Sequence, residues 1–128
     1  MNATVKHILV VDDDPFTAEL TGMILESSEY EVILADGGVD ALEKLASGID
    51  ICIVVSDMNM PFMDGIQLFA EIRGQGGTQP FVLITGEDAA PLRIAHPEMD
   101  AIITKDEELQ ETLPELVAVL MATKAGQL

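Results

Sequence analysis

The sequence predicts a doubly wound α/β fold, a (βα)5 arrangement of five parallel strands that alternate with five helices. Short β-rich runs and amphipathic segments alternate along all 128 residues. Three of the runs, 8–11, 51–55 and 81–84, are apolar without interruption. Such runs are typical of parallel strands covered by helices on both faces. A chain of this length forms one domain around one core.

The chain is strongly acidic, with 23 Asp and Glu against 6 Lys and Arg and a formal net charge of −17. Nucleic-acid binding needs clustered Lys and Arg, so this class of partner is excluded. The longest apolar stretches, such as 116–122, are shorter than the roughly 18–20 residues that cross a bilayer. Cys52 is the single cysteine, so no internal disulfide forms. The apolar run near the N-terminus, 8–11, is too short for the apolar segment of a signal peptide. We expect a cytoplasmic protein that binds no membrane.

The first helix is expected over residues 15–28. Asp14 is its candidate N-cap, and Pro15 stands at the first helical position. Apolar side chains then recur at helical spacing. This spacing indicates an amphipathic helix, and it is carried by Phe16, Leu20, Met23 and Ile24.

Apolar spacing and glycines mark the other helices. Gly48 is a C-terminal stop for the second helix, and a glycine-rich segment, 74–77, follows the third. Residues 112–115 read as a capping box, which predicts that the last helix begins at Thr112 and that 106–111 is a separate short turn. The fourth helix is expected to be short, because the segment 87–100 contains Pro91 and Pro97 and few apolar residues at helical spacing. We therefore expect strands at 8–11, 31–35, 51–56, 81–85 and 101–104, and helices at 38–47, 64–73 and 90–95 besides those at 15–28 and from 112.

Four strand ends deliver polar side chains to one edge of the sheet. The natural strand order is the flavodoxin-like 2-1-3-4-5, in which ligands bind where the order reverses, beyond the carboxyl ends of the strands. Asp12 and Asp13 follow the first strand there, and Asp57, Thr85 and Lys105 end or follow the third, fourth and fifth. Clustered carboxylates repel unless a cation lies among them, and Mg²⁺ takes carboxylates together with phosphate oxygens. This combination predicts phosphoryl transfer to an aspartate.

Four motifs carry a family resemblance: residues 8–15, residues 57–65, Thr85-Gly86 and Thr104-Lys105. Together they resemble the receiver domain of two-component response regulators, over about residues 6–124. The resemblance implies that Asp57 is the phosphoacceptor and that its donor is a phosphohistidine on a histidine kinase or phosphotransfer protein. It also implies that Lys105 pairs with the phosphoryl group and that Thr85 moves to hydrogen-bond it. The implied Mg²⁺ ligands are Asp12, Asp13, Asp57 and the backbone carbonyl of Asn59.

Other positions specify the kind of receiver. Asn59 and Glu87 form the pairing found in chemotaxis-type receivers, where these positions modulate dephosphorylation. Ile102 stands where relatives usually carry the Tyr or Phe of the switch, and Asp106 stands where they carry Pro. Both departures fall on the output face, formed by the fourth helix, the fifth strand and the fifth helix. We expect this face to bind a downstream protein or a second copy, and to switch through the backbone near Gly86 without an aromatic side chain.

Other functions remain open at this point. The same aspartyl-phosphate chemistry would serve a small phosphatase, but its second acidic residue is replaced by Asn59. A flavin-binding module would need Ser, Thr and Gly where Asp12, Asp13 and Asp14 stand. We expect a regulator that catalyses only its own phosphorylation and dephosphorylation. The chain either acts alone or is the receiver part of a larger regulator or hybrid kinase.

Overall fold

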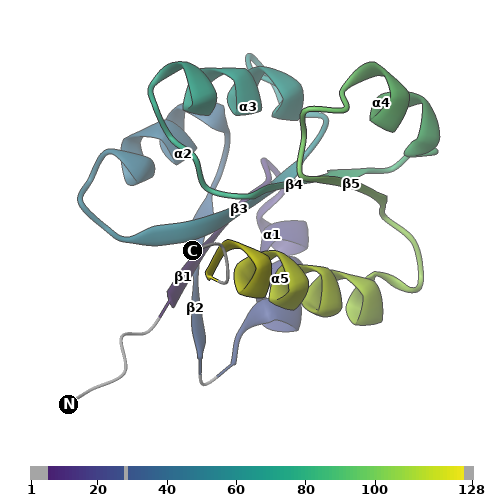
Figure 1. Cartoon of the computed structure of the whole chain (residues 1–128), viewed down its shortest axis with the longest axis horizontal. Helices are drawn as coiled ribbons and strands as arrows, with labels where there is room; N and C mark the ends of the chain where they lie inside the picture. The colour runs from purple at the N-terminus through teal and green to yellow at the C-terminus, as the bar shows by residue number, and fades with distance from the viewer. Residues whose placement is uncertain (1–5, 28, 126–128) are drawn as a thin grey trace.

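A computed structural model describes residues 6–27 and 29–125 of the chain. Its five strands form one parallel sheet in the order β2-β1-β3-β4-β5, flanked by a helical layer on each face (Figure 1). The predicted fold class and strand order are therefore confirmed. The strands are β1 (Lys6–Val11), β2 (Tyr30–Ala35), β3 (Ile51–Asp57), β4 (Phe81–Thr85) and β5 (Ala101–Thr104), and the helices are α1 (Pro15–Leu25), α2 (Gly38–Leu45), α3 (Gly65–Gly74), α4 (Ala90–Ala95) and α5 (Leu109–Ala125).

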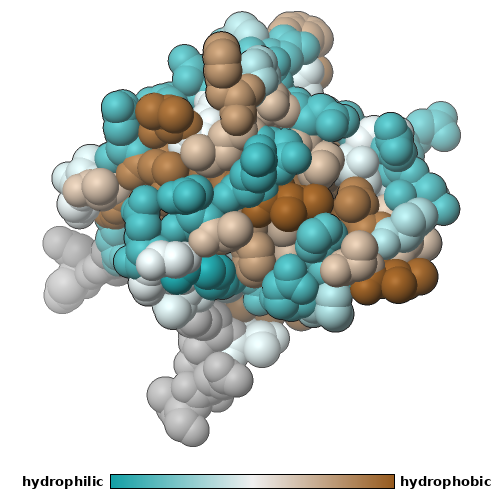
Figure 2. Space-filling model, turned by 90° about the horizontal axis from the view of Figure 1, so that it is seen from above, coloured by the Kyte–Doolittle hydropathy of each residue, from teal (hydrophilic) through white to brown (hydrophobic). Residues whose placement is uncertain are grey.

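Helices α2, α3 and α4 cover one face of the sheet, and α1 and α5 cover the other (Figure 1). Successive strand residues point to opposite faces. Leu9 and Val11 accordingly join the core beneath α2 and α3, whereas Ile8 and Val10 join the core beneath α1 and α5. Both faces of the central strands are buried, which explains their continuous apolar runs. Figure 2 looks onto the α2, α3 and α4 layer, where hydrophobic side chains lie in small groups between hydrophilic ones.

Helix α1 buries mostly small residues, and most of its large apolar side chains are exposed. Ala18, Gly22 and Leu25 face the sheet, and a Cβ atom on Gly22 would lie 3.2 Å from Cγ1 of Val32. This close approach turns the large apolar residues outward. The apolar spacing therefore predicted the helix correctly but does not mark its buried face, since Phe16, Leu20 and Met23 are 69%, 45% and 73% exposed.

The bounds of α1 agree with the prediction at its start only. The carboxylate of Asp14 accepts the N–H of Phe16 at 3.1 Å, which confirms Asp14 as the N-cap. The helix ends at Leu25, before the predicted end, and Ser28 lies outside the described residues.

The predicted start of the last helix is wrong. Helix α5 begins at Leu109, and Pro114 lies inside it. A carboxylate oxygen of Asp106 accepts the N–H of Glu108 at 3.0 Å in the turn that leads into the helix. Burial explains the earlier start, because an apolar stripe with a four-residue period already begins at Leu109. The stripe consists of Leu109, Leu113, Val117 and Met121.

The remaining differences are small. Helix α2 ends at Leu45 instead of residue 47, and Asp64 is the N-cap of α3 rather than its first residue. The capping box at α3 is reciprocal: Asp64 accepts the N–H of Gln67 at 2.8 Å, and the Gln67 side chain accepts the N–H of Asp64 at 2.9 Å. Within the described residues, none of the helices is long and apolar enough to cross a membrane.

Candidate functional site

Three carboxylates meet at the carboxyl ends of β1 and β3. Asp12 and Asp13 follow β1 and Asp57 ends β3, and each can place one oxygen within 4.8 Å of the others. The strand order brings them together, because β1 pairs with β3 and Val11 lies opposite Ser56. Hard cations hold oxygen ligands at roughly 2–2.6 Å, so ligand oxygens around one ion lie within about 5 Å of one another. The three carboxylates fit a single ion of this kind.

Asp12 is the buried member of this cluster, and its side chain is 8% exposed. Burial raises the pKa of its carboxyl above the usual range, and the negative charge of Asp57 adds to this effect. A hydrogen bond from the N–H of Asp14 to Asp12 Oδ1, 3.0 Å long, opposes the shift in pKa. Holding Asp12 ionised therefore costs free energy, which a bound cation would offset.

Lys105 supplies positive charge to the carboxylates. Its Nζ lies 3.3 Å from Oδ1 of Asp57 and 4.0 Å from Oδ2 of Asp12. The residue directly follows β5, and its backbone N–H donates to the carbonyl of Thr85 at 2.7 Å. This bond continues the pairing of β4 with β5 by one residue and fixes the base of the lysine side chain.

The other predicted site residues surround the cluster without joining it. Thr85 is buried, and its Oγ1 accepts the N–H of Glu87 at 3.1 Å. Asn59 and Glu87 are exposed on the loops that follow β3 and β4. Ile102 is 4% exposed and packs in the core between the sheet and the α2, α3 and α4 layer.

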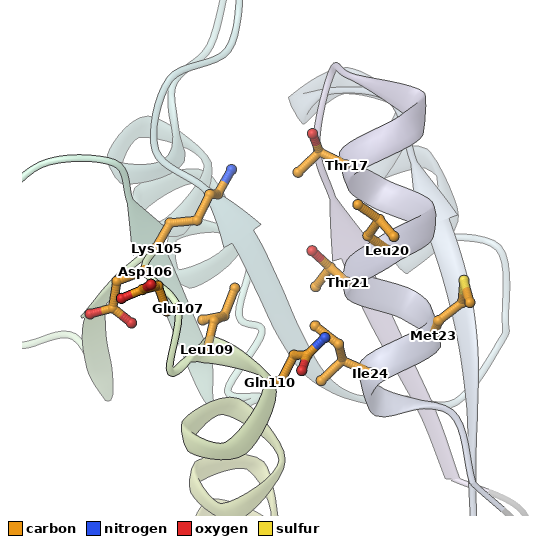
Figure 3. A pocket seen from close by; sticks show the side chains of 10 residues that line it. All are labelled: Thr17, Leu20, Thr21, Met23, Ile24, Lys105, Asp106, Glu107, Leu109 and Gln110. Atoms are coloured by element: carbon orange, nitrogen blue, oxygen red, sulfur yellow. The ribbon is translucent and has the colours of Figure 1, made fainter.

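A groove beside Lys105 was not predicted from the sequence. It has a volume of about 670 Å³ and lies between α1 and the start of α5. Figure 3 shows Leu20, Ile24 and Leu109 on its walls and Lys105 at one end. One feature of the sequence could have indicated it: the small residues Ala18 and Gly22 stand four positions apart on α1. They are buried against the sheet, so larger side chains such as Leu20 stay on the outer side of the helix, where they line the groove.

Comparison with known proteins identifies the family and the fold. The family model of the response regulator receiver domain matches residues 8–117. Response regulator MprA of Mycobacterium tuberculosis is 35% identical over 120 residues, which are 92% of this chain and 52% of that protein. Transcriptional regulatory protein GlrR of Escherichia coli is 38% identical over 89 residues, 70% of this chain and 20% of that protein. The chain thus spans about half or less of the length of these curated relatives.

A solved structure shows the same architecture. Response regulator protein TrrA of Thermotoga maritima, crystallised in complex with Mg²⁺-BeF, superposes with a TM-score of 0.80 at 31% identity, covering 91% of this chain and 99% of that one. The receiver domain of the hybrid histidine kinase CckA gives a TM-score of 0.71 at 29% identity, covering 90% and 98%. With the matching family model, the strand order and the acidic cluster, these likenesses show that this chain belongs to the response regulator receiver domain family.

Proposed function

We propose that Asp57 accepts a phosphoryl group from a phosphohistidine of a sensor kinase or phosphotransfer protein. The observation that carries this proposal is the ion pair of Lys105 with Asp57, 3.3 Å long, beside the carboxylates of Asp12 and Asp13. In this reaction a carboxylate oxygen of Asp57 attacks phosphorus, the bond from phosphorus to the histidine nitrogen breaks, and the imidazole leaves. The electron pair of the broken bond stays on the imidazole nitrogen, and a proton on the imidazole ring lets the histidine leave as a neutral group.

Asp12, Asp13, Asp57 and the backbone carbonyl of Asn59 would hold Mg²⁺ at this site. Bound there, the ion would neutralise charge on the phosphoryl oxygens. The likeness to a receiver crystallised with Mg²⁺-BeF supports this assignment. The raised pKa of Asp12 supports it too, because its buried carboxylate lacks sufficient compensation from protein groups alone.

Lys105 and Thr85 complete the proposed reaction centre. The ammonium group of Lys105 lies at the carboxylate that is to be phosphorylated, where it would stabilise the added negative charge. Thr85 ends the neighbouring strand, and its hydroxyl would turn from Glu87 towards the phosphoryl group. Asn59 and Glu87, both exposed at the rim, would modulate the access of the water that removes it.

The groove between α1 and α5 is the proposed docking site of the phosphodonor protein. Its apolar walls run up to Lys105, so a protein seated there presents a phosphohistidine to Asp57. Leu20, on this wall, is 45% exposed although it is apolar. A phosphohistidine made from ATP is a cytoplasmic species, and we place this domain in the cytoplasm for that reason.

The face formed by α4, β5 and α5 is the proposed binding surface for a downstream protein or a second copy of the chain, and phosphorylation is proposed to change it. A hollow of about 350 Å³ lies on this face, lined by Arg93, Met99 and Leu116 among others. Phosphorylation adds about 1.5–2 negative charges at the adjacent strand ends. A change in the position of α4 would alter this hollow and with it the surface offered to a partner.

Phosphotransfer from a panel of autophosphorylated histidine kinases tests this function. We expect rapid transfer of radiolabel from one or a few kinases to the wild type, and slower transfer to Leu20→Glu. Acetyl phosphate should label both proteins at equal rates, because it needs no docking groove. Steady release of phosphate from added phosphomonoesters, without a labelled protein, would instead favour a phosphatase.

A further inference from the structure

Helix α4 is attached to the sheet mainly through polar contacts. None of its six residues, all of which the structure describes, is buried. Leu92 alone among them packs partly against the core, and Ile94 is 82% exposed. Because so little apolar surface holds it, the position of this helix depends on a few hydrogen bonds. Figure 1 shows α4 at one end of its layer, above β5.

Two of these hydrogen bonds join the α4 region to β5. Nε of Arg93 donates to the carbonyl of Ile102 at 2.8 Å. The N–H of Ala89, directly before the helix, donates to Oγ1 of Thr104 at 3.2 Å. Strand β5 is an edge strand, so the carbonyl of Ile102 can reach a donor outside the sheet. The bond from Arg93 is charge-assisted and belongs to the stronger class.

Thr104 also stands directly opposite Thr85 in the register of β5 and β4. Both hydroxyl oxygens accept a backbone N–H from the same loop, Thr85 that of Glu87 and Thr104 that of Ala89. The loop between β4 and α4 is therefore held at two points, one on each strand. A movement of Thr85 towards Asp57 releases the first point, and the loop can then move with α4 only if the second point opens as well.

We propose that Arg93 and Thr104 form a latch that holds α4 against β5 and opposes activation. The inference rests on the proposed phosphorylation of Asp57 and names the residues that regulate it. The Ile102 side chain is buried in the core beneath this layer, and the backbone carbonyl of the residue adds a hydrogen bond that links β5 to α4. Arg93 and Thr104 are positioning residues in this scheme, since within residues 6–27 and 29–125 their hydrogen bonds are to Ile102 and Ala89 and not to the carboxylate cluster.

The latch contacts are thermodynamically coupled to binding of a phosphoryl mimic, so their effect can be measured as an affinity. Contacts made only with α4 closed stabilise the closed arrangement, and a phosphoryl mimic that draws in Thr85 must overcome them. Removing a latch contact therefore strengthens binding of the mimic, although it weakens the folded protein. A residue with a merely structural role would lower stability without raising this affinity.

The test is the affinity of the full chain for beryllofluoride in the presence of Mg²⁺, measured by calorimetry. We expect Thr104→Val to bind about five- to tenfold more tightly than the wild type, as the loss of one neutral hydrogen bond implies. Arg93→Met should bind about tenfold more tightly or better, because its lost hydrogen bond is charge-assisted. Thr104→Ser keeps the hydroxyl and should retain the wild-type affinity. Lys44→Met removes the same positive charge as Arg93→Met, from the remote helix α2, and should also retain it.

Amide hydrogen exchange gives a second readout in the protein without beryllofluoride. We expect faster exchange over residues 87–95 in Arg93→Met and Thr104→Val, with unchanged exchange around Asp57. Affinities that stay at the wild-type value, or fall, in both variants would overturn the latch. A wild type that binds no beryllofluoride with Mg²⁺ would overturn the proposed function, and the latch with it.

Discussion

The ammonium group of Lys105 reaches the carboxylate of Asp57 across the end of an intervening strand. Asp57 ends β3 and Lys105 follows β5, while β4 lies between them in the sheet. The two groups nevertheless approach to 3.3 Å, because the lysine backbone is tied to the carbonyl of Thr85 at the end of β4. The site is thus assembled from the ends of four strands, β1, β3, β4 and β5, that the parallel topology places at one edge of the sheet. The positive charge of Lys105 there faces the carboxylates of Asp57 and Asp12.

Replacing Lys105 tests the role of this ion pair. We expect Lys105→Met to slow phosphorylation by acetyl phosphate about tenfold or more, since a hydrogen bond to a charged group is worth roughly 1.5–3 kcal/mol. A time course of intact mass measures the rate. Lys44→Met is the control for the lost charge and should react like the wild type. Equal rates in the two variants would show that Lys105 does not act at the reaction centre.

Two neighbouring aspartates, Asp13 and Asp14, have different expected roles: Asp13 is a metal ligand and Asp14 is a helix cap. Asp13→Ala should weaken Mg²⁺ binding by about tenfold or more, because it removes one of three converging carboxylates. Asp14→Ala should leave the affinity almost unchanged and lower the thermal stability, because Asp14 caps α1 through Phe16 and Thr17. Calorimetric titration of EDTA-treated protein compares the two. Equal losses of affinity would contradict the assignment of Asp13.

The raised pKa of Asp12 predicts an unusual pH dependence. Its stability contribution is lost as the pH rises from the ordinary pKa of 3.8 through the raised pKa of the folded protein, because the folded state holds the proton more tightly. Without divalent cations, Asp12→Asn should therefore raise the Tm at pH 7. The difference should shrink as the pH approaches 3.8, and Mg²⁺ should stabilise the wild type alone. Thermal melts in EDTA across this range give the answer, and a lower Tm for the variant at pH 7 would contradict it.

The contribution of Asp14 to stability depends on pH in the opposite direction. Its hydrogen bond with Thr17 lowers the pKa of the exposed carboxyl, so its contribution to stability is present above the ordinary pKa of 3.8 and is lost as the pH falls through the lower folded-state value. Comparing Asp12→Asn with Asp14→Asn over the same pH series separates the two effects.

Gly65 is required by the close approach of α3 to the site. A Cβ atom there would lie 2.7 Å from the carbonyl oxygen of Asp57 and would also meet the side chain of Leu83. Gly65→Ala should lower the free energy of unfolding by about 1–3 kcal/mol and slow phosphorylation by displacing Asp57. Gly74, at the other end of α3, has open space around its Cβ position, so Gly74→Ala should stay within about 1 kcal/mol of the wild type. Urea unfolding measures both, and equal stabilities would contradict the steric argument.

The sequence predicted the site better than it predicted the helix surfaces. The acidic pair, Asp57 and Lys105 each follow or end an apolar run, so the topology alone brings them together. The exposed face of α1 was not predictable in this way, because hydrophobicity favours burial of Phe16 over that of Gly22, whereas the helix lies so close to β2 at Gly22 that a Cβ atom there would be 3.2 Å from Cγ1 of Val32. The start of α5 was misplaced for a related reason: a local capping pattern at Thr112 was preferred to the longer apolar stripe that begins at Leu109.

Some contacts between helices and strands, and some local backbone conformations, could not be predicted from the sequence. The bond of Arg93 to the carbonyl of Ile102 depends on how α4 lies over β5, which no local pattern encodes. The backbone of Phe62 is a second case, since its φ of 70° is the left-handed conformation that bulky residues rarely adopt. The residue is fully exposed on the loop between β3 and α3. The sequence there gave no sign of this conformation.

Locating the phosphoryl group by mass spectrometry tests the central claim most directly. The protein is treated with acetyl phosphate and Mg²⁺, reduced with borohydride to trap the acyl phosphate, and digested. We expect one modified residue per chain, Asp57, with modification dependent on Mg²⁺ and absent in Asp57→Asn. A modification on another residue of the wild type, or one that persists at the same level in Asp57→Asn, would contradict the assignment of Asp57 as the phosphoacceptor.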